Sequence, residues 1–183
     1  MIGAAARGVT PSLGVPVLET ERLILRAPAT EDLDSSFAMW SDPEVVRYIG
    51  GRPFTREEVW SRILRGAGLW AMLGYGFFAV VERASGRFVG DVGFAEFRRD
   101  LRPPTEGTPE MGWVLAPWSH GRGYAGEAVA AALAWADKAL AADRLCCIID
   151  PDNAPSIRVA TRAGFSETAR GVYTGKPILI FHR

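Results

Sequence analysis

Short apolar runs alternate along this chain with segments whose apolar residues recur at helical spacing. In the first half, the apolar core Leu23–Leu25 marks a strand, and Leu33, Phe37 and Trp40 would share one helical face. The pattern over this half predicts strands at 17–26, 76–82 and 87–97, with a hairpin turn at 84–86, and helices from Thr30, over 43–48 and from a capping box at 55–58 toward Leu64.

The second half continues the alternation with a loop over 98–108 and then further strands and helices. We expect strands at 109–116, 144–149, 165–170 and 177–181, and helices at 123–142 and 153–163. The inward face of the long helix would carry Val129, Leu133, Ala136 and Leu140. Strands and helices in this order indicate a mixed α/β (α+β) domain.

Size and charge narrow the class of protein. The chain has 183 residues, of which 48% are hydrophobic, which suits one domain over 17–183 preceded by a flexible, Gly-rich tail over 1–16. Lys plus Arg and Asp plus Glu balance at 21 each, so we expect neither nucleic acid nor membrane as a partner. We find no spanning apolar run and no secretory signal, and therefore expect a cytoplasmic protein.

The cysteines and histidines indicate no metal site. Cys146 and Cys147 are adjacent within an apolar run, so they would point to opposite faces of a strand and behave as buried, unbridged hydrophobic residues. His120 and His182 are the only histidines, and neither stands at a metal-binding spacing from a cysteine. We therefore expect no metal ion.

A glycine-rich turn, His120-Gly121-Arg122-Gly123-Tyr124-Ala125-Gly126, separates the strand at 109–116 from the long helix. The free N–H groups of a helix N-terminus, approached through glycines, form a seat for phosphate. Gly121, Gly123 and Gly126 satisfy the G-x-G-x-x-G dinucleotide pattern, with Asp150 ending the next strand as the ribose ligand. Against a dinucleotide fold stand Pro117 before the turn, the late position of the motif and the absence of preceding βαβ units.

The segment from His120 to Ala125 resembles the acyl-CoA signature of the GNAT acetyltransferases, Gln/Arg-x-x-Gly-x-Gly/Ala, departing from it only at His120. Three further segments are similar, in order, to the RimJ/RimL-type branch of that family: 19–26, 110–115, and Asn153 to Ser156 followed by 163–165. The resemblance spans roughly Leu18 to the C-terminus.

This resemblance implies the GNAT-like fold and coenzyme A as donor. That fold is a central, mostly antiparallel, twisted sheet of about seven strands, splayed between the fourth and fifth and flanked by about four helices. The pantetheine arm would pair with the main chain of Trp113, Val114 and Leu115 in the gap. Its pyrophosphate would be bound by the backbone at five consecutive positions of the turn: Arg122, Gly123, Tyr124, Ala125 and Gly126.

The implied reaction is acyl transfer from a thioester to an amine. A free alkylammonium has a pKa of about 10.4, so a carboxylate is needed to accept its proton; Glu110 is the first candidate and Glu96 the second. A backbone N–H near Val114 or Leu115 would stabilise the developing oxyanion. Many relatives protonate the leaving thiolate with a tyrosine where this chain has Ala160, and Ser156 is the substitute we name. Asn153 would cap the helix and contact the pantetheine.

The resemblance thus implies an acetyl-CoA-dependent N-acetyltransferase acting on a primary amine, either a protein N-terminal α-amine or a small-molecule amine. Trp40, Tyr48, Trp60 and Trp70 enrich the acceptor region in aromatics, while Arg47 and Arg52 would favour an acidic acceptor. Two alternatives remain: a nicotinamide-dependent oxidoreductase built on the three glycines, and a non-catalytic acyl-CoA-binding module. A homodimer is the assembly we expect if the chain self-associates.

Overall fold

One eight-stranded sheet runs through the computed structural model, which describes residues 14–183. Its strand order is β1-β2-β3-β4-β5-β6-β8-β7, and all neighbours are antiparallel except the parallel pair β5–β6. The strands are β1 (Leu18–Glu19), β2 (Leu23–Arg26), β3 (Phe77–Glu82), β4 (Phe88–Ala95), β5 (Glu110–Leu115), β6 (Cys146–Ile149), β7 (Ser166–Tyr173) and β8 (Lys176–His182). The α+β fold of a splayed, mostly antiparallel sheet is therefore confirmed.

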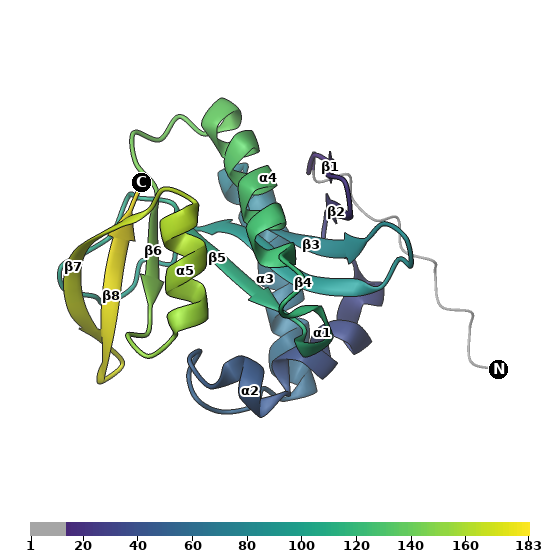
Figure 1. Cartoon of the computed structure of the whole chain (residues 1–183), viewed down its shortest axis with the longest axis horizontal. Coiled ribbons are helices and arrows are strands. Elements are labelled where there is room, and N and C mark those ends of the chain that lie inside the picture. The colour runs from purple at the N-terminus through teal and green to yellow at the C-terminus, as the bar shows by residue number, and fades with distance from the viewer. Residues whose placement is uncertain (1–13) are drawn as a thin grey trace.

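Helices cover both faces of this sheet. They are α1 (Leu33–Trp40), α2 (Pro43–Val46), α3 (Arg56–Leu73), α4 (Tyr124–Ala139) and α5 (Ala154–Arg162), with short 3₁₀ turns at Thr30–Asp32 and Pro117–Ser119. Figure 1 shows α4 and α5 in front of the sheet and α3 behind it. Two apolar clusters match these layers: α4 packs on Phe78, Val92 and Phe94, and α1 and α2 pack on Ala79 and Phe88.

The expected helix starts are confirmed by their caps. Thr55 and Glu58 form the predicted capping box at α3, and the Asp42 carboxylate accepts the N–H of Glu44 at α2. The predicted inward face of α4 is also confirmed, with Val129, Leu133 and Ala136 buried and Leu140 packed partly against the same cluster.

Two expected boundaries differ clearly from the structure. The single strand expected over 17–26 is a small hairpin in which Leu18 pairs with Leu25, because the chain reverses at Thr20–Arg22. Helix α3 continues past Leu64 to Leu73 and ends at Gly74, whose φ is 74°. Its interior glycines, Gly66 and Gly68, have low helix propensity and therefore weaken the helical pattern in the sequence. Packing of the buried Gly66 near Pro28 favours the helix in the folded protein. The tail expected over 1–16 lies almost wholly outside the described residues.

Candidate active site

The parallel strands β5 and β6 meet at one point and then separate. Their register contains the single pair Glu110–Cys146, supported by the Cys146 N–H donating to the Pro109 carbonyl at 3.0 Å. Beyond it the two strands line opposite walls of a cavity of about 390 Å³, β5 through residues 110–114 and β6 through residues 147–149. This is the splay that the resemblance implies between the fourth and fifth expected strands, which are β5 and β6 because the first expected strand is the β1–β2 hairpin. It leaves one edge of β5 without a strand partner.

The backbone of β5 presents alternate residues to that open edge. The Ala116 N–H donates to the Val89 carbonyl at 2.8 Å, so the alternation of an antiparallel ladder directs Val114 toward β4 as well. Trp113 and Leu115 then turn their N–H and C=O groups toward the gap. Of the three residues predicted to pair with the pantetheine, two have the required orientation. Of the two positions predicted to supply an N–H to the oxyanion, Val114 and Leu115, only Leu115 turns its N–H toward the gap.

His120, the one departure from the acyl-CoA signature, closes the end of this edge. Its Nε2 lies 2.8 Å from the Leu115 carbonyl oxygen, which places the donated proton on Nε2 because the carbonyl can only accept. The imidazole therefore connects the glycine turn to the last residue of β5 by a hydrogen bond. This contact gives His120 a structural role at the position where it departs from the acyl-CoA signature.

The glycine turn has the geometry of an anion-binding site. Gly121 and Gly123 have φ values of 73° and 78°, in the left-handed region that other residues enter at a cost, and α4 begins at Tyr124. Within residues 14–183, the backbone N–H groups from Gly121 to Gly126 donate no hydrogen bond. They lie at the positive end of a 16-residue helix and are available to phosphate oxygens.

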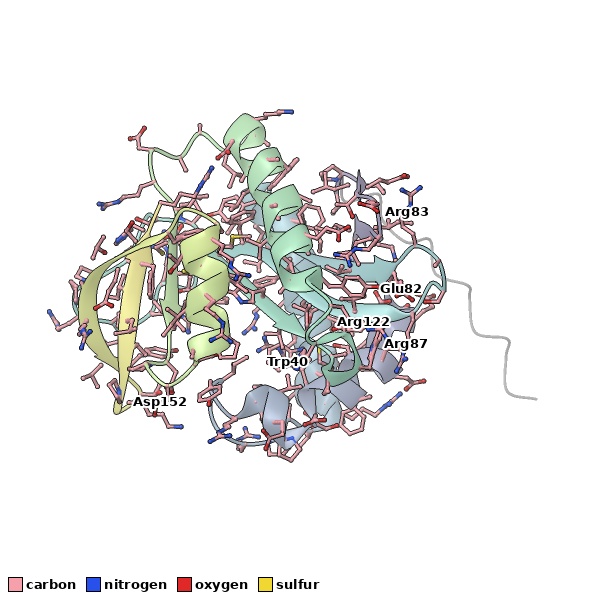
Figure 2. All side chains as sticks on the ribbon, in the orientation of Figure 1. Trp40, Glu82, Arg83, Arg87, Arg122 and Asp152 are labelled. Carbon is pink, nitrogen blue, oxygen red and sulfur yellow. The ribbon has the colours of Figure 1, made fainter. Side chains whose placement is uncertain are left out.

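Charged side chains surround this turn. Figure 2 shows Glu82, Arg87 and Arg122 gathered where β3 and β4 approach the start of α4. An Arg122 Nη1 lies 3.7 Å from a Glu82 carboxylate oxygen, and Tyr124 donates its hydroxyl hydrogen to the same carboxylate. The guanidinium of Arg87 lies 4.0 Å from the centre of the Trp118 ring. Arg122 is thus held near the turn by a weak ion pair that a phosphate can displace.

Glu110 lines the cavity, but its carboxylate is already paired. Arg99 donates to both oxygens, Nε to Oε2 at 2.8 Å and Nη2 to Oε1 at 2.9 Å, and Glu110 is only 6% exposed. The paired carboxylate raises the pKa of Arg99 above its ordinary value, against the opposing effect of burial. Both oxygens of Glu110 thus already accept a hydrogen bond, and Arg99 holds the carboxylate in a fixed orientation.

A second carboxyl group, Asp91 of β4, lines the same cavity and was missed in the sequence. It pairs across the ladder with Val114, and the indole N–H of Trp40 donates to its Oδ2 at 3.1 Å. Burial raises its pKa from 3.8 to about 6, against the opposing effects of the Trp40 hydrogen bond and the positive charge of Arg62. A lone polar residue in an apolar strand, Phe-Val-Gly-Asp-Val-Gly-Phe, was the available signal.

The remaining predicted residues divide between the cavity and the surface. Asn153 and Ser156 both line the cavity at the start of α5, and the Asn153 side chain caps the helix by accepting the Ser156 N–H at 3.2 Å. Glu96 is not a lining residue; it accepts the Gly107 N–H at 3.3 Å and lies 3.4 Å from Arg98. The pair Asn153 and Ser156 is therefore brought to the gap, while Glu96 stabilises the loop before β5.

The predicted aromatic residues divide between the cavity, the core and the surface, and both cysteines are buried. Trp40 and Tyr48 line the cavity, whereas Trp70 is buried in the main core and Trp60 is 36% exposed. The two cysteines are free and buried as expected, and burial raises the pKa of Cys146 to about 12. Among residues 14–183 no cluster of potential metal ligands occurs, and no helix there is both long and apolar enough to cross a membrane.

Comparison with known proteins agrees with this geometry. The family model described as "Acetyltransferase (GNAT) domain" matches residues 22–166, so the chain belongs to the GNAT acetyltransferase family. A curated relative, the uncharacterized N-acetyltransferase p20 of Bacillus licheniformis, is 28% identical over 82% of both chains. A GNAT-family acetyltransferase of Bordetella pertussis, known by its structure, is 32% identical, covers 92% of this chain and 99% of its own, and superposes with a TM-score of 0.81.

A more distant structure shares the fold. RimL, a ribosomal L7/L12 α-N-protein acetyltransferase solved in complex with coenzyme A, is 15% identical, covers 92% of this chain and 97% of its own, and superposes with a TM-score of 0.74. Family membership makes the chain an acetyl-CoA-dependent N-acetyltransferase. The nicotinamide-dependent alternative built on the three glycines is wrong, because the turn lies between β5 and α4 of a GNAT fold whose sheet has a single parallel pair among the described strands.

Proposed function

We propose that the protein transfers an acetyl group from acetyl-CoA directly to a primary amine, a protein N-terminal α-amine or a small-molecule amine, within a ternary complex. The observation that carries this proposal is the separation of β5 and β6 beyond Glu110–Cys146, which opens the cavity to the unpaired edge of β5. An extended arm fits such an edge as an added strand. Residues of β5 and of β6 would then both line the space in which the thioester meets the amine. Direct attack of the amine on the thioester requires no acylated side chain as an intermediate.

The proposed donor site consists of two sets of backbone groups, those on the open edge of β5 and the N–H groups of the glycine turn. Trp113 and Leu115 would hydrogen-bond the pantetheine amides, with Val114 between them shaping the wall. The N–H groups from Arg122 through Tyr124 to Gly126 would hold the pyrophosphate, with the Arg122 side chain as an added cation. Bound there, acetyl-CoA supplies an activated thioester carbonyl.

The chain's own task is then to move protons. The neutral amine nitrogen bonds to the carbonyl carbon, the carbon–sulfur bond breaks, and the leaving thiolate takes up a proton. Ser156, on the first turn of α5 and lining the cavity, is positioned by the Asn153 cap to donate a hydrogen bond toward sulfur. The proton lost by the amine goes to a cavity carboxylate or to water.

Two carboxylates compete for this proton, Glu110 and Asp91. The Asp91 carboxyl, with its pKa raised to about 6, is suited to accept a proton near neutral pH, whereas both oxygens of Glu110 already accept hydrogen bonds from Arg99. If Asp91 is the base, kcat/KM rises with pH up to about pH 6, because only the ionised carboxylate accepts the proton, and Asp91→Asn removes this limb. If Glu110 acts instead, Glu110→Gln lowers kcat/KM and Asp91→Asn leaves it unchanged.

The experiment for the proposed function measures donor binding and turnover separately. Calorimetry should detect acetyl-CoA binding, and a thiol-reactive dye should report CoA release when amines are added. Ser156→Ala should lower kcat while preserving acetyl-CoA affinity, and the exposed Thr161→Ala on the same helix is its control. Failure to bind acetyl-CoA would exclude the proposed donor site. Binding without release across a broad amine panel would instead favour the non-catalytic acyl-CoA-binding module.

A further inference from the structure

Two arginines of α3 face the cavity, and neither forms an ion pair with a described carboxylate. Arg62 and Arg65 are three residues apart and so lie on one side of the helix, and both line the cavity. Within the described part of the chain, neither side chain donates a hydrogen bond, and neither lies within 4.0 Å of a carboxylate. By contrast, Arg99 on the same wall is fully paired with Glu110.

The Arg62 guanidinium is held in place by aromatic rings. It lies 3.7 Å from the centre of the ring of Trp40, the last residue of α1, which Figure 2 labels, and 5.2 Å from the centre of the Phe54 ring. Burial lowers the pKa of Arg62 to about 10, and burial also lowers that of Arg65, which is more exposed. An anion beside them would recover part of this electrostatic cost.

The donor does not account for these two cations. Its phosphates belong at the glycine turn before α4, and the pantetheine arm that enters the gap carries no charge. The arginines singled out in the sequence, Arg47 and Arg52, are not equivalent either. Arg52 is paired with Glu58, and Arg47 lies 3.9 Å from Glu44.

Trp40 contacts both Arg62 and a carboxyl group. One ring face carries Arg62, while the indole N–H donates to Asp91 at 3.1 Å. The cavity therefore offers the Asp91 carboxylate for an ammonium group and, across the indole, the Arg62 guanidinium for an anion, with Arg65 lining the same cavity. A molecule that carries both charges on a small frame matches this arrangement.

We infer that the amine acceptor is a small amino-acid-like molecule whose own carboxylate is bound by Arg62 and Arg65. This inference rests on the proposed function and narrows its acceptor. The cavity of about 390 Å³ must also admit the thioester end of the donor, which leaves space for a small molecule and favours it over a long peptide. Guanidinium groups suit this task because their planar donors match the two oxygens of a carboxylate.

The test uses matched acceptors that differ in one charge. The twenty amino acids are compared with their amides, by CoA release in the presence of saturating acetyl-CoA. We expect the acids to exceed the amides in kcat/KM by about tenfold to hundredfold, the range of a charge-assisted contact. Equal or better use of the amides would overturn the inference. Peptide pairs ending in carboxylate or amide, and pairs with Glu or Gln at the second position, show whether a peptide supplies the carboxylate instead, which would also overturn it.

Variants locate the selectivity on α3. Arg62→Gln and Arg65→Gln should abolish the preference for acids mainly through KM, whereas Arg62→Lys should restore part of it. Arg56→Gln is the matched control, because Arg56 begins the same helix but pairs with Asp34 outside the cavity. Circular dichroism checks the fold of each variant, and the comparison of acids with amides in the unaltered protein does not depend on any variant folding.

The outcomes separate this inference from the proposed function. CoA release with neutral amines but no preference for acids refutes the carboxylate site and leaves the acetyltransferase intact. If no amine supports release, calorimetry of the amino acids against the CoA-bound protein still decides: binding that Arg62→Gln abolishes supports the site, and absence of binding excludes it.

Discussion

Replacing Asp91 with asparagine should stabilise the protein most at high pH. The change is nearly isosteric, and the amide oxygen can still accept the Trp40 indole N–H, so the main difference is loss of the buried charge. The folded pKa of about 6 exceeds the ordinary 3.8, so the folded state holds the proton more tightly than the unfolded state. Stability contributed by this group is therefore greatest at low pH and is lost as pH rises from 3.8 through 6.

The magnitude follows from the same two pKa values. Linkage gives a cost of ionised Asp91 to the folded state of about 1.6 kcal/mol at pH 5 and about 3 kcal/mol at pH 8. The free energy of unfolding of Asp91→Asn should thus exceed that of the unaltered protein by a margin that grows by about 1.4 kcal/mol between these pH values.

Urea denaturation of both proteins from pH 5 to pH 8 measures this margin directly. Asp143→Asn is the control, because Asp143 is exposed and outside the cavity; its margin should stay below about 0.5 kcal/mol throughout. A margin for Asp91→Asn that is flat or shrinks with rising pH would refute the burial argument. If Asp91→Asn loses turnover while it gains stability, the Asp91 charge is retained for function at a cost in stability.

Three further changes test other parts of the site and fold. Arg99→Met should cost about 3–5 kcal/mol of unfolding free energy by stranding the buried Glu110 carboxylate, and adding Glu110→Gln should recover most of it in a denaturation double-mutant cycle; additivity would contradict the pairing. His120→Ala should cost about 1 kcal/mol and weaken acetyl-CoA binding in calorimetry, since the Leu115 carbonyl loses its donor; unchanged affinity would separate the imidazole from the donor site. Thr55→Ala should cost about 1 kcal/mol in thermal or urea unfolding without changing kcat, and a loss of kcat would argue against a purely local cap.

Features that depend on neighbouring residues were predictable from the sequence. The capping box at Thr55, the Asn153 cap and the glycine turn before α4 are set by residues at most a few positions apart. The resemblance in the turn and in the segment after β6 then predicted the residues of the donor site. The full length of α3 was not predicted, because the low helix propensity of its interior glycines opposes a helix that tertiary packing stabilises.

The acceptor side depended on contacts between distant segments. Trp40 and Asp91 are 51 positions apart, and Arg62 reaches them from a third element. The partner of Glu110 is likewise chosen by how the loop before β5 folds back. A residue's charge, burial and pKa are properties of its surroundings, and those surroundings exist only after the sheet and α3 have packed. The sequence by itself determined the family and the donor, whereas only the tertiary structure brought Asp91, Arg62 and Arg65 to one cavity.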